Sequence, residues 1–596
     1  MSTATLPKPV TKSEHTAPPA FLKALFAGHF EETLIFPFPE IPADTKETVA
    51  AFTDACRDFY AQHIDSVKID QDHFFPRDVV KGLGDLGLMG MTIPEEFGGS
   101  GFSATAYSKT MEQIGPLDAS AAIVVGAHQS IGLKPLLLFG SQEQKMRWLP
   151  DLATGKLVGA FCLTEPESGS DAASLKSTAV LDPVTNEYVL NGTKQWISNG
   201  GFASFFTVFA RIPSPEVAEK DKHKEIACFV VVTNPDGTLP GLSRGPEEKK
   251  LGLCGSSTVQ IVLDNCRIPA ANLIGDKGHG FKIAVETLNT GRTSLGAGSV
   301  GGSKVMLKLA AEHATQRRQF KTSISEFEMI RHKFTRMTAS TYALESMVYL
   351  TTGLIDRGIK DYSLEGACCK VFGTETLWSN INDALQIAGG NGFMNEYPYG
   401  RALRDSRINM IFEGTNEILR LLLALTGMKE VGDSLKEVQG AIKRPMAQMG
   451  ILTTYAHKRM KGVITQDRLT QVHPTLAPEA DQVGHYAGVF ANAVETLVRK
   501  HGKKVIEKEY QQERLADVLI DLYAQIATLS RVTSSIQKRG EEKAQAEIDV
   551  TRWFCFQAKH RMVGNLKALE KNRDTEATAI SNAVYAAGGY PFDLWQ

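Results

Sequence analysis

The segment Ala160-Phe-Cys-Leu-Thr-Glu-Pro-Glu-Ser-Gly-Ser-Asp171 begins with apolar residues and then places hydroxyl, glycine and proline residues in a tight turn. Such a turn leaves backbone N–H groups free to donate hydrogen bonds. Together with the hydroxyls of Thr164 and Ser170, these groups can bind a flavin ring or a pyrophosphate. A capped turn without a ligand is the alternative, and the composition of the segment alone favours that alternative.

Three further segments contain residues that could bind a ligand or take part in catalysis. Gln386-Ile-Ala-Gly-Gly-Asn-Gly392 is rich in glycine, which permits close approach of a backbone. Arg407-Ile-Asn-Met-Ile-Phe-Glu-Gly-Thr-Asn-Glu-Ile418 holds a carboxylate beside a glycine, although an E-G-T triplet alone is more often a helix start. Leu288-Asn-Thr-Gly-Arg292 ends in an arginine that a surface salt bridge would also explain.

A nucleotide-binding pattern, G-x-G-x-x-G, is present at Gly296-Ala-Gly-Ser-Val-Gly301. In dinucleotide-binding proteins this pattern follows a strand, whereas here it follows a segment with helical spacing. We therefore expect a face of small residues for close helix packing, and no nicotinamide site.

The elements that carry these segments change character twice along the chain. Apolar residues recur at helical spacing before residue 157 and again after residue 280. Between them, short β-branched and aromatic runs alternate with turn residues, and Asn191-Gly192 predicts a hairpin. The order helical, β, helical predicts a mainly α fold with a central β domain.

The expected domains follow from these changes and from a chain of 596 residues, which is too long for one hydrophobic core. Beyond the bundle, helical patterns recur over Gly488–His501 and Arg514–Ile536. We expect an N-terminal extension (1–44), a helical domain (45–159), a middle β domain (160–278), a helical bundle (279–428) and a C-terminal helical domain (429–596).

Composition excludes several classes of protein. Hydrophobic content of 43%, charged content of 22% and a net charge of −2 leave no global basic field for nucleic acid. Eight cysteines without a C-x-x-C pair argue against a disulfide framework or a zinc site, so we expect no metal. No apolar run approaches a membrane span and no signal peptide is evident, which predicts a cytoplasmic protein.

Residues 434–468 form a basic connector with interleaved apolar residues. This segment contains seven lysine and arginine residues and only two acidic residues, Glu437 and Asp467. Such a segment is compatible with anionic lipid, at about 1 kcal/mol per basic residue near the surface. A solvated surface helix is the equally weighted alternative.

Taken together and in their order, these segments resemble the acyl-CoA dehydrogenase family. AFCLTEPESGSD and Lys194-Gln-Trp-Ile-Ser-Asn-Gly200 resemble its β-domain motifs, and the segment ending at Ile418 resembles its most diagnostic one. Arg317-Arg-Gln-Phe320 resembles the family's segment in which an arginine contacts the pyrophosphate of FAD and an aromatic residue follows three positions later. Gly126–Gly132 and His473–Pro478 are similar to the long, very-long-chain form, which has an extra C-terminal helical domain.

The resemblance implies the fold and the cofactor. It implies a helical N-terminal domain, a β-barrel-like middle domain, a helical bundle and the C-terminal domain, with FAD bound. It assigns cofactor contacts to Phe161, Leu163, Thr164, Gly169, Ser170, Trp196, Ser198, Arg317, Phe320, Gln386, Gly389, Gly390, Thr415 and Glu417. It assigns substrate contacts to Ser170, Asn289, Arg292 and Gly414. Read alone, Trp196 would be a core aromatic.

The resemblance makes Glu413 the catalytic base. Desaturation of an acyl thioester needs a carboxylate on one face of the Cα–Cβ bond and a hydride acceptor on the other. The thioester carbonyl is polarised by donors, the N–H of the base among them. Glutamate has an ordinary pKa of about 4.3, and desolvation raises it towards the value that a base needs.

The resemblance also implies partners. These are a long-chain acyl-CoA, electron-transferring flavoprotein, a second subunit in a homodimer or a dimer of dimers, and the inner membrane as a peripheral contact. In a eukaryote the compartment would be the mitochondrial matrix. Arg317 and the loop containing Gly389 would contact the cofactor of the neighbouring subunit. An acyl-CoA oxidase and an FAD-binding assembly factor of the same fold are the alternatives.

Chain length is predicted from Ala119-Ser-Ala-Ala-Ile-Val-Val-Gly-Ala127, which has no charged or large side chain. In the family this helix borders the far end of the acyl pocket. Each additional buried CH₂ contributes about 0.8 kcal/mol, so an open pocket favours long chains, roughly C14 and above. A well-packed core helix is the alternative.

Overall fold

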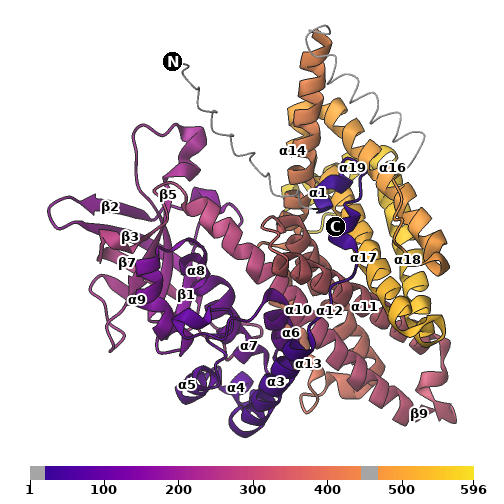
Figure 1. Cartoon of the computed structure of the whole chain (residues 1–596), viewed down its shortest axis with the longest axis horizontal. Coiled ribbons are helices and arrows are strands. Elements are labelled where there is room, and N and C mark those ends of the chain that lie inside the picture. Colours follow the sequence, from indigo (N-terminus) through magenta and orange to yellow (C-terminus); the bar gives the residue numbers. More distant parts are fainter. Residues whose placement is uncertain (1–20, 444–466, 596) are drawn as a thin grey trace, which may run out of the picture.

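The computed structural model describes residues 21–443 and 467–595 (Figure 1). Helices, a β domain and more helices follow one another along the chain, which confirms the predicted mainly α fold with a central β domain. In Figure 1 the strands lie to one side of the long helices α10, α11 and α12.

The first part is helical. Its helices are α1 (Phe21–Leu25), α2 (Glu32–Ile35), α3 (Ala43–His63), α4 (Ser66–Asp72), α5 (Arg77–Asp85), α6 (Ala104–Ile114), α7 (Ala119–Gly126), α8 (Lys134–Phe139) and α9 (Gln142–Ala153), with a π-helical turn, η2 (Ala127–Gly132), after α7. Side chains fix several of the starts. Asp118 caps α7 by accepting a hydrogen bond from the N–H of Ala121 at 2.7 Å.

The predicted N-terminal extension is described from Phe21 onward. Phe21, Leu22 and Leu25 are buried in the same hydrophobic cluster as residues of the C-terminal helices. The Phe21 ring lies edge-on to that of Tyr523, with centroids 5.4 Å apart. This segment is therefore part of the core that joins the bundle to the C-terminal domain.

Within residues 21–443 and 467–595, one helical stretch, Ala119–Phe139, is long and apolar enough to cross a membrane by length and composition. Apolar runs in the sequence did not predict such a stretch. The stretch comprises α7, η2 and α8, and 56% of its most apolar window is buried within the protein. Leu133 and Leu136 pack with Ile283 and Ala284 of α10 in one cluster, so these apolar residues serve the protein's own core.

The β domain is one sheet in the order β6-β7-β3-β2-β4-β5-β8, with β1 parallel to β4. The strands are β1 (Gly159–Cys162), β2 (Thr178–Asp182), β3 (Glu187–Ser198), β4 (Phe205–Arg211), β5 (Ile226–Val232), β6 (Leu242–Arg244), β7 (Thr258–Pro269) and β8 (Leu273–Ile274). Strands β4 and β5 are buried along nearly their whole length. They are apolar on both sides because one cluster lies between them and the helices and another within the curved sheet.

The predicted hairpin at Asn191-Gly192 is wrong. These residues lie inside the continuous strand β3, where the pairing with β7 shifts register between Leu190 and Gly192. A Cβ on Gly192 would collide with Ser177, so the glycine permits close approach of two backbones at a β-bulge. The hairpin turn itself joins β2 to β3 and contains Asn186, which has a φ of 53°.

The bundle consists of α10 (Gly280–Gln316), α11 (Glu328–Asp356), α12 (Ser363–Ala388), α13 (Tyr399–Arg407) and α14 (Asn416–Lys443), with a small ladder of β9 (Arg318–Gln319) and β10 (Thr322–Ser323). Glycines in α10 bring its neighbours close. A Cβ on Gly296 would lie 3.2 Å from the Cβ of Cys369, and one on Gly301 would overlap the carbonyl of Glu112. The small-residue packing face predicted for Gly296–Gly301 is confirmed.

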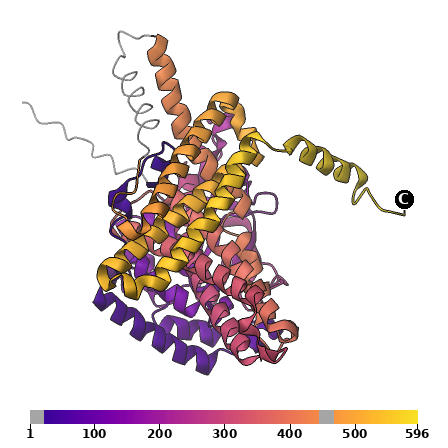
Figure 2. The same cartoon turned by 90° about the vertical axis from the view of Figure 1, so that its right-hand side faces the viewer.

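The C-terminal helices are α16 (Ala477–His501), α17 (Glu509–Arg539), α18 (Glu541–Glu570) and α19 (Asp574–Ala587), and α16 and α17 confirm the helical patterns. Helix α17 is buried against the bundle, whereas α19 has no buried residue and projects away from the body (Figure 2). Most of the basic connector, residues 444–466, lies outside the described residues, so its contact with lipid stays a prediction.

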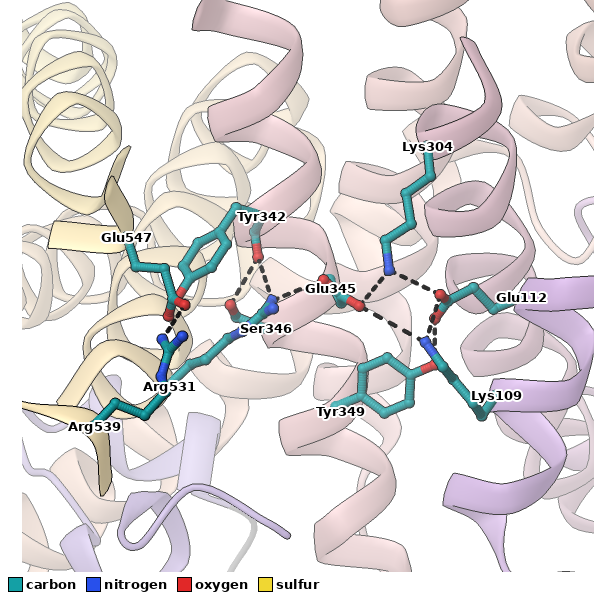
Figure 3. A network of polar contacts seen from close by, with 10 residues as sticks. All are labelled: Lys109, Glu112, Lys304, Tyr342, Glu345, Ser346, Tyr349, Arg531, Arg539 and Glu547. Carbon is teal, nitrogen blue, oxygen red and sulfur yellow. Dashed lines mark hydrogen bonds and ion pairs between the residues drawn. The ribbon is translucent and has the colours of Figure 1, made fainter. Parts of the chain in front are cut away.

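A network of charged residues joins the C-terminal helices to the bundle (Figure 3). Glu345 of α11 lies at its centre and pairs with Lys304 of α10 and, at 2.9 Å, with Arg531 of α17. Lys304 also bonds Glu112 of α6 at 2.8 Å. Burial alone would raise the pKa of Glu345, but Arg531, Lys304 and Lys109 bring it down to about 2.

Candidate active site

Glu413 lies in a short left-handed turn between α13 and α14. Its φ is 59° and that of Gly414 is 89°, a conformation that residues other than glycine rarely adopt. The hydroxyl of Thr415 accepts a hydrogen bond from the N–H of Ile418 at 3.2 Å and so caps α14. The E-G-T triplet is thus a helix start, as its composition suggested, and it also presents a carboxylate.

Two cations hold the backbone of this turn. Arg292 Nε of α10 donates to the carbonyl of Glu413 at 3.2 Å, and Lys370 Nζ of α12 donates to that of Gly414 at 2.8 Å. Asn289 orients Arg292 by accepting from its Nη1 at 2.9 Å. Arg292, Asn289 and Gly414, predicted as substrate contacts, therefore lie together around Glu413. Arg292 is buried, so the alternative that it forms a salt bridge at the surface is wrong.

The carboxyl group of Glu413 is shielded from water and has little hydrogen bonding. Its Oε2 is buried and accepts no hydrogen bond from the described residues. Burial raises the pKa of Glu413 to about 7, against the opposing effect of Arg292 and Lys370. A carboxylate with a pKa near neutrality, held close to a cavity, is suited to accept a proton from carbon.

Gly291 leaves room for this carboxyl group. A Cβ at Gly291 would lie 3.0 Å from Glu413 Oε2 and 3.4 Å from Ile131 Cγ2. Any larger residue would displace the carboxyl or reduce the space in front of it. Sequence patterns do not indicate this role, because Gly291 lies in α10 and Glu413 lies in a turn much later in the chain.

A cavity of about 270 Å³ extends from Glu413 between α7 and α10. Ala119, Ala122, Ile123, Gly126 and Ala127 line one side, as expected of the apolar run that they belong to. The opposite side is a stripe of mostly small residues of α10, made up of Gly291, Ser294, Leu295, Gly298, Ser299, Gly302, Val305, Met306 and Leu309. These residues span five turns of the helix, about 27 Å.

The predicted cofactor residues of the β domain lie next to this cavity. Ser198 lines it together with Glu413. Two residues before Ser198, Trp196 has a φ of 56° at a second irregularity in β3 and is 60% exposed. The N–H of Gln195 donates to the carbonyl of Thr164 at 2.9 Å, which places the turn containing Thr164 beside Trp196. Trp196 is thus not a core aromatic.

A buried ion pair anchors that turn. Lys194 is fully buried, and its Nζ bonds Glu165 Oε1 at 2.6 Å and the carbonyl of Phe209 at 2.6 Å. Glu165 also accepts from the N–H and the hydroxyl of Ser177. Ser170 and Gly169, beyond this anchor, are exposed.

The side chains of Phe161 and Leu163 point into the protein core, whereas that of Trp196 is exposed. The Phe161 ring packs on Phe209 with centroids 5.0 Å apart, and Leu163 is buried. Their side chains belong to the core between the sheet and the helices. We therefore expect any contact of these two residues with a cofactor to come from their main-chain groups.

Five further predicted cofactor residues lie just beyond the end of α10 and at the end of α12. Arg317 follows the last residue of α10, 25 positions after Arg292, which is about 37 Å along a helix. Phe320 is 90% exposed, Gln386 is exposed, and Cβ atoms on Gly389 and Gly390 would meet nothing within 4 Å. The structure therefore does not bring these residues to the cavity of their own chain.

The arrangement at the β domain fits a flavin. The exposed indole of Trp196 offers an aromatic face, the turn at Thr164 offers a hydroxyl and backbone donors, and Ser198 connects both to the cavity of Glu413. Glu417, at the start of α14, is exposed and its pKa is lowered, chiefly by its own backbone N–H. Among the described residues, no cluster of histidine, cysteine, aspartate and glutamate could hold a metal ion.

Family models match most of the chain. The N-terminal, middle and C-terminal domains of acyl-CoA dehydrogenases match residues 46–156, 160–266 and 278–427, and the ACAD9/ACADV C-terminal domain matches residues 474–590.

Individual proteins are similar over the same extent. The mitochondrial very long-chain specific acyl-CoA dehydrogenase of Bos taurus is 37% identical over 97% of this chain and 89% of its own. A crystal structure of an acyl-CoA dehydrogenase from Bacillus anthracis complexed with FAD has a TM-score of 0.78, with 32% identity over 96% of both chains. Butyryl-CoA dehydrogenase from Megasphaera elsdenii has a TM-score of 0.61 and 30% identity over 65% of this chain and 99% of its own. The chain belongs to the acyl-CoA dehydrogenase family and is an FAD-dependent oxidoreductase.

Proposed function

We propose that this protein oxidises long-chain acyl-CoA thioesters to trans-2-enoyl-CoA, the first step of fatty acid β-oxidation. The observation that carries the proposal is the carboxyl group of Glu413, with its buried Oε2 unbonded by the described residues, at one end of a cavity lined along about five turns of α10. An acyl chain extending along α10 would place its first carbons beside this carboxyl group.

In this proposal, different residues of the chain transfer the proton, position the base and bind the cofactor. Glu413 takes the α-proton, and its burial gives it a pKa suited to that transfer. Arg292 and Lys370 hold the turn by its carbonyls, which leaves the N–H of Glu413 to polarise the thioester. The acceptor for the hydride of the β-carbon would be supplied by bound FAD. Trp196, Thr164, Ser170 and Ser198 would hold its ring beside the cavity.

Long acyl chains are supported by the lining of the cavity. Ile123 and several alanine and glycine residues line the α7 side, and Gly298 leaves space on the α10 side. The relative from Bos taurus, which matches nearly the whole chain, is named as specific for very long chains. We propose palmitoyl-CoA as a better substrate than butyryl-CoA.

Partners are proposed on the family resemblance and on the placement of exposed residues. Arg317, Phe320 and the loop at Gly389 would meet the FAD of a second subunit, since they lie far from the cavity of their own. Electron-transferring flavoprotein would receive the electrons. The enzyme would work in the cytoplasm of a bacterium or in the mitochondrial matrix of a eukaryote, where relatives such as the Bos taurus protein are named mitochondrial.

The test is an anaerobic titration of the purified yellow protein with acyl-CoAs of graded length, in which bleaching of the flavin is recorded. Palmitoyl-CoA should bleach it fully and butyryl-CoA weakly. Bleaching by butyryl-CoA but not by palmitoyl-CoA would contradict the chain length, and no bleaching by any thioester would contradict the reaction. Oxygen uptake with substrate alone would identify an oxidase.

A further inference from the structure

Lys370 is a buried lysine that forms no ion pair with any of the residues that the structure describes. It lies in the middle of α12 and is 0% exposed. Its Nζ donates to two neutral oxygens, the carbonyl of Gly414 and Oδ1 of Asn416, each at 2.8 Å. No carboxylate of the described residues lies within ion-pair distance of it. Burying a charge in this way costs several kcal/mol, so its presence here requires an explanation beyond packing.

We propose that Lys370 is a positioning residue for Glu413, holding the left-handed turn through the Gly414 carbonyl and favouring the ionised carboxylate through its charge. This inference rests on the proposed role of Glu413 as the base. It assigns Lys370 no contact with substrate or cofactor.

The geometry of the turn supports the positioning role. Glu413 and Gly414 both have positive φ, which is strained for a glutamate and persists only where surrounding contacts enforce it. The two consecutive carbonyls of the turn are each held by a cation from a different helix, Arg292 from α10 and Lys370 from α12. Together the two helices fix the direction of the Glu413 side chain.

Charge supports the second part of the proposal. The charged groups that act on this pair are Arg292 of α10, Glu375 of α12 and Glu417 of α14. Burial raises the pKa of Glu413, whereas Arg292 and Lys370 lower it. Burial lowers the pKa of Lys370 to about 7, and Glu413 opposes that change. Protonated Lys370 therefore favours the carboxylate form, which is the form that can accept a proton.

A chain of hydrogen bonds holds the second acceptor of Lys370 in place. Asn416 Nδ2 donates to Glu375 Oε1 at 3.0 Å, and Arg420 donates to both oxygens of Glu375 at 2.8 and 3.0 Å. Arg420 Nε also donates to Asp517 Oδ1 of α17 at 2.8 Å. A continuous series of side-chain hydrogen bonds therefore connects the C-terminal domain to Lys370, which holds the turn at Glu413.

The experiment compares the pH dependence of flavin reduction in FAD-loaded variants. Lys370→Met removes both charge and donor, Lys370→Gln keeps a donor, and Lys370→Arg keeps the charge. Lys360→Met, at an exposed lysine before the same helix, controls for net charge. Rapid mixing with saturating palmitoyl-CoA gives the reduction rate at each pH.

In Lys370→Met and Lys370→Gln, the acid limb of the profile should move to higher pH by about one unit, because a nearby positive charge has been lost. Lys370→Arg and Lys360→Met should keep the wild-type limb. An unmoved limb in both Met and Gln variants at position 370 would overturn the inference. Loss of soluble, FAD-loaded protein in both would also overturn it, because Lys370 would then serve the fold.

Glu413→Gln, measured alongside, separates this inference from the proposed function. If Glu413→Gln still reduces its flavin at the wild-type rate, the base has been assigned wrongly. If it is inactive while the Lys370 variants keep the wild-type limb, only the role of Lys370 is wrong.

Discussion

At the scale of single residues, the site depends on one carboxyl group and the space kept around it. Glu413→Gln is nearly isosteric and keeps the backbone contacts to Arg292, so fold and FAD content should be unchanged. The amide cannot accept a proton, and turnover should fall by roughly 10²-fold to 10⁴-fold or more. Stopped-flow reduction of the flavin measures this, and a near-normal rate would contradict the mechanism.

Sequence patterns located some of these residues and missed others for a physical reason. Glu413, Arg292 and Asn289 stand in short motifs, and the structure places them together; their catalytic roles stay predictions. Gly291 and Lys370 contact a turn that comes from another part of the chain: Gly291 leaves room for the Glu413 carboxyl, and Lys370 donates a hydrogen bond to the Gly414 carbonyl. A glycine or a lysine within a helix carries no local sign of such a contact.

At the scale of elements, the stripe of small residues on α10 sets the capacity of the cavity. A Cβ on Gly298 would meet nothing within 4 Å, and this residue lies two turns from Gly291, about 10 Å along the helix. Gly298→Leu should therefore fill the cavity partway and exclude long chains. Flavin reduction by palmitoyl-CoA should fall at least tenfold, while reduction by octanoyl-CoA should be largely kept.

Gly298→Ala is the matched control, because its methyl group fits the free space. It should leave the preference for palmitoyl-CoA unchanged. Equal loss with both thioesters in Gly298→Leu would show that acyl chains do not pass this point.

The elements themselves were predictable to the extent that they are long and periodic. The helices α10, α11, α12 and α17 and the strands of the middle domain follow from apolar spacing. The bulge at Gly192 was not predicted, because the Asn-Gly pair that suits a tight turn also suits a bulge. Only the contact with Ser177, which sequence does not show, decides between the two.

At the scale of the whole molecule, the Glu345 network fastens the C-terminal helices to the bundle (Figure 3). Glu345→Gln should lower the free energy of unfolding by about 1.5–3 kcal/mol, because Arg531 loses its carboxylate partner while Lys304 keeps only Glu112. Chemical denaturation measures this. Glu326→Gln, in an exposed pair with Arg331, should change it by less than about 1 kcal/mol.

The same network gives a pH dependence with a definite sign. The pKa of Glu345 is lowered from 4.5 to about 2 on folding, so its contribution is present above about pH 4.5 and is lost as the pH falls towards 2. The difference in stability between wild type and Glu345→Gln should therefore shrink in acid. A constant difference across that range would show that Glu345 is not ionised in the folded protein.

Arg317 is predicted to lie at the boundary between two subunits. If Arg317 contacts the FAD of a neighbouring subunit, Arg317→Ala removes a charge-assisted hydrogen bond worth about 1.5–3 kcal/mol, and FAD affinity should fall roughly 10-fold to 100-fold. Equilibrium dialysis with FAD measures this. Arg318→Ala, at the adjacent exposed arginine, should bind FAD like wild type; equal retention by both variants would remove Arg317 from the site.

All eight cysteines are free and buried, and burial raises the pKa of every one of their thiols. The folded protein is therefore a background without reactive thiols. A single cysteine introduced at an exposed position such as Val184, which is 90% exposed, would be the one site that a maleimide probe labels quickly. Spectroscopic labels can thus be placed on this protein one at a time without replacing any native cysteine.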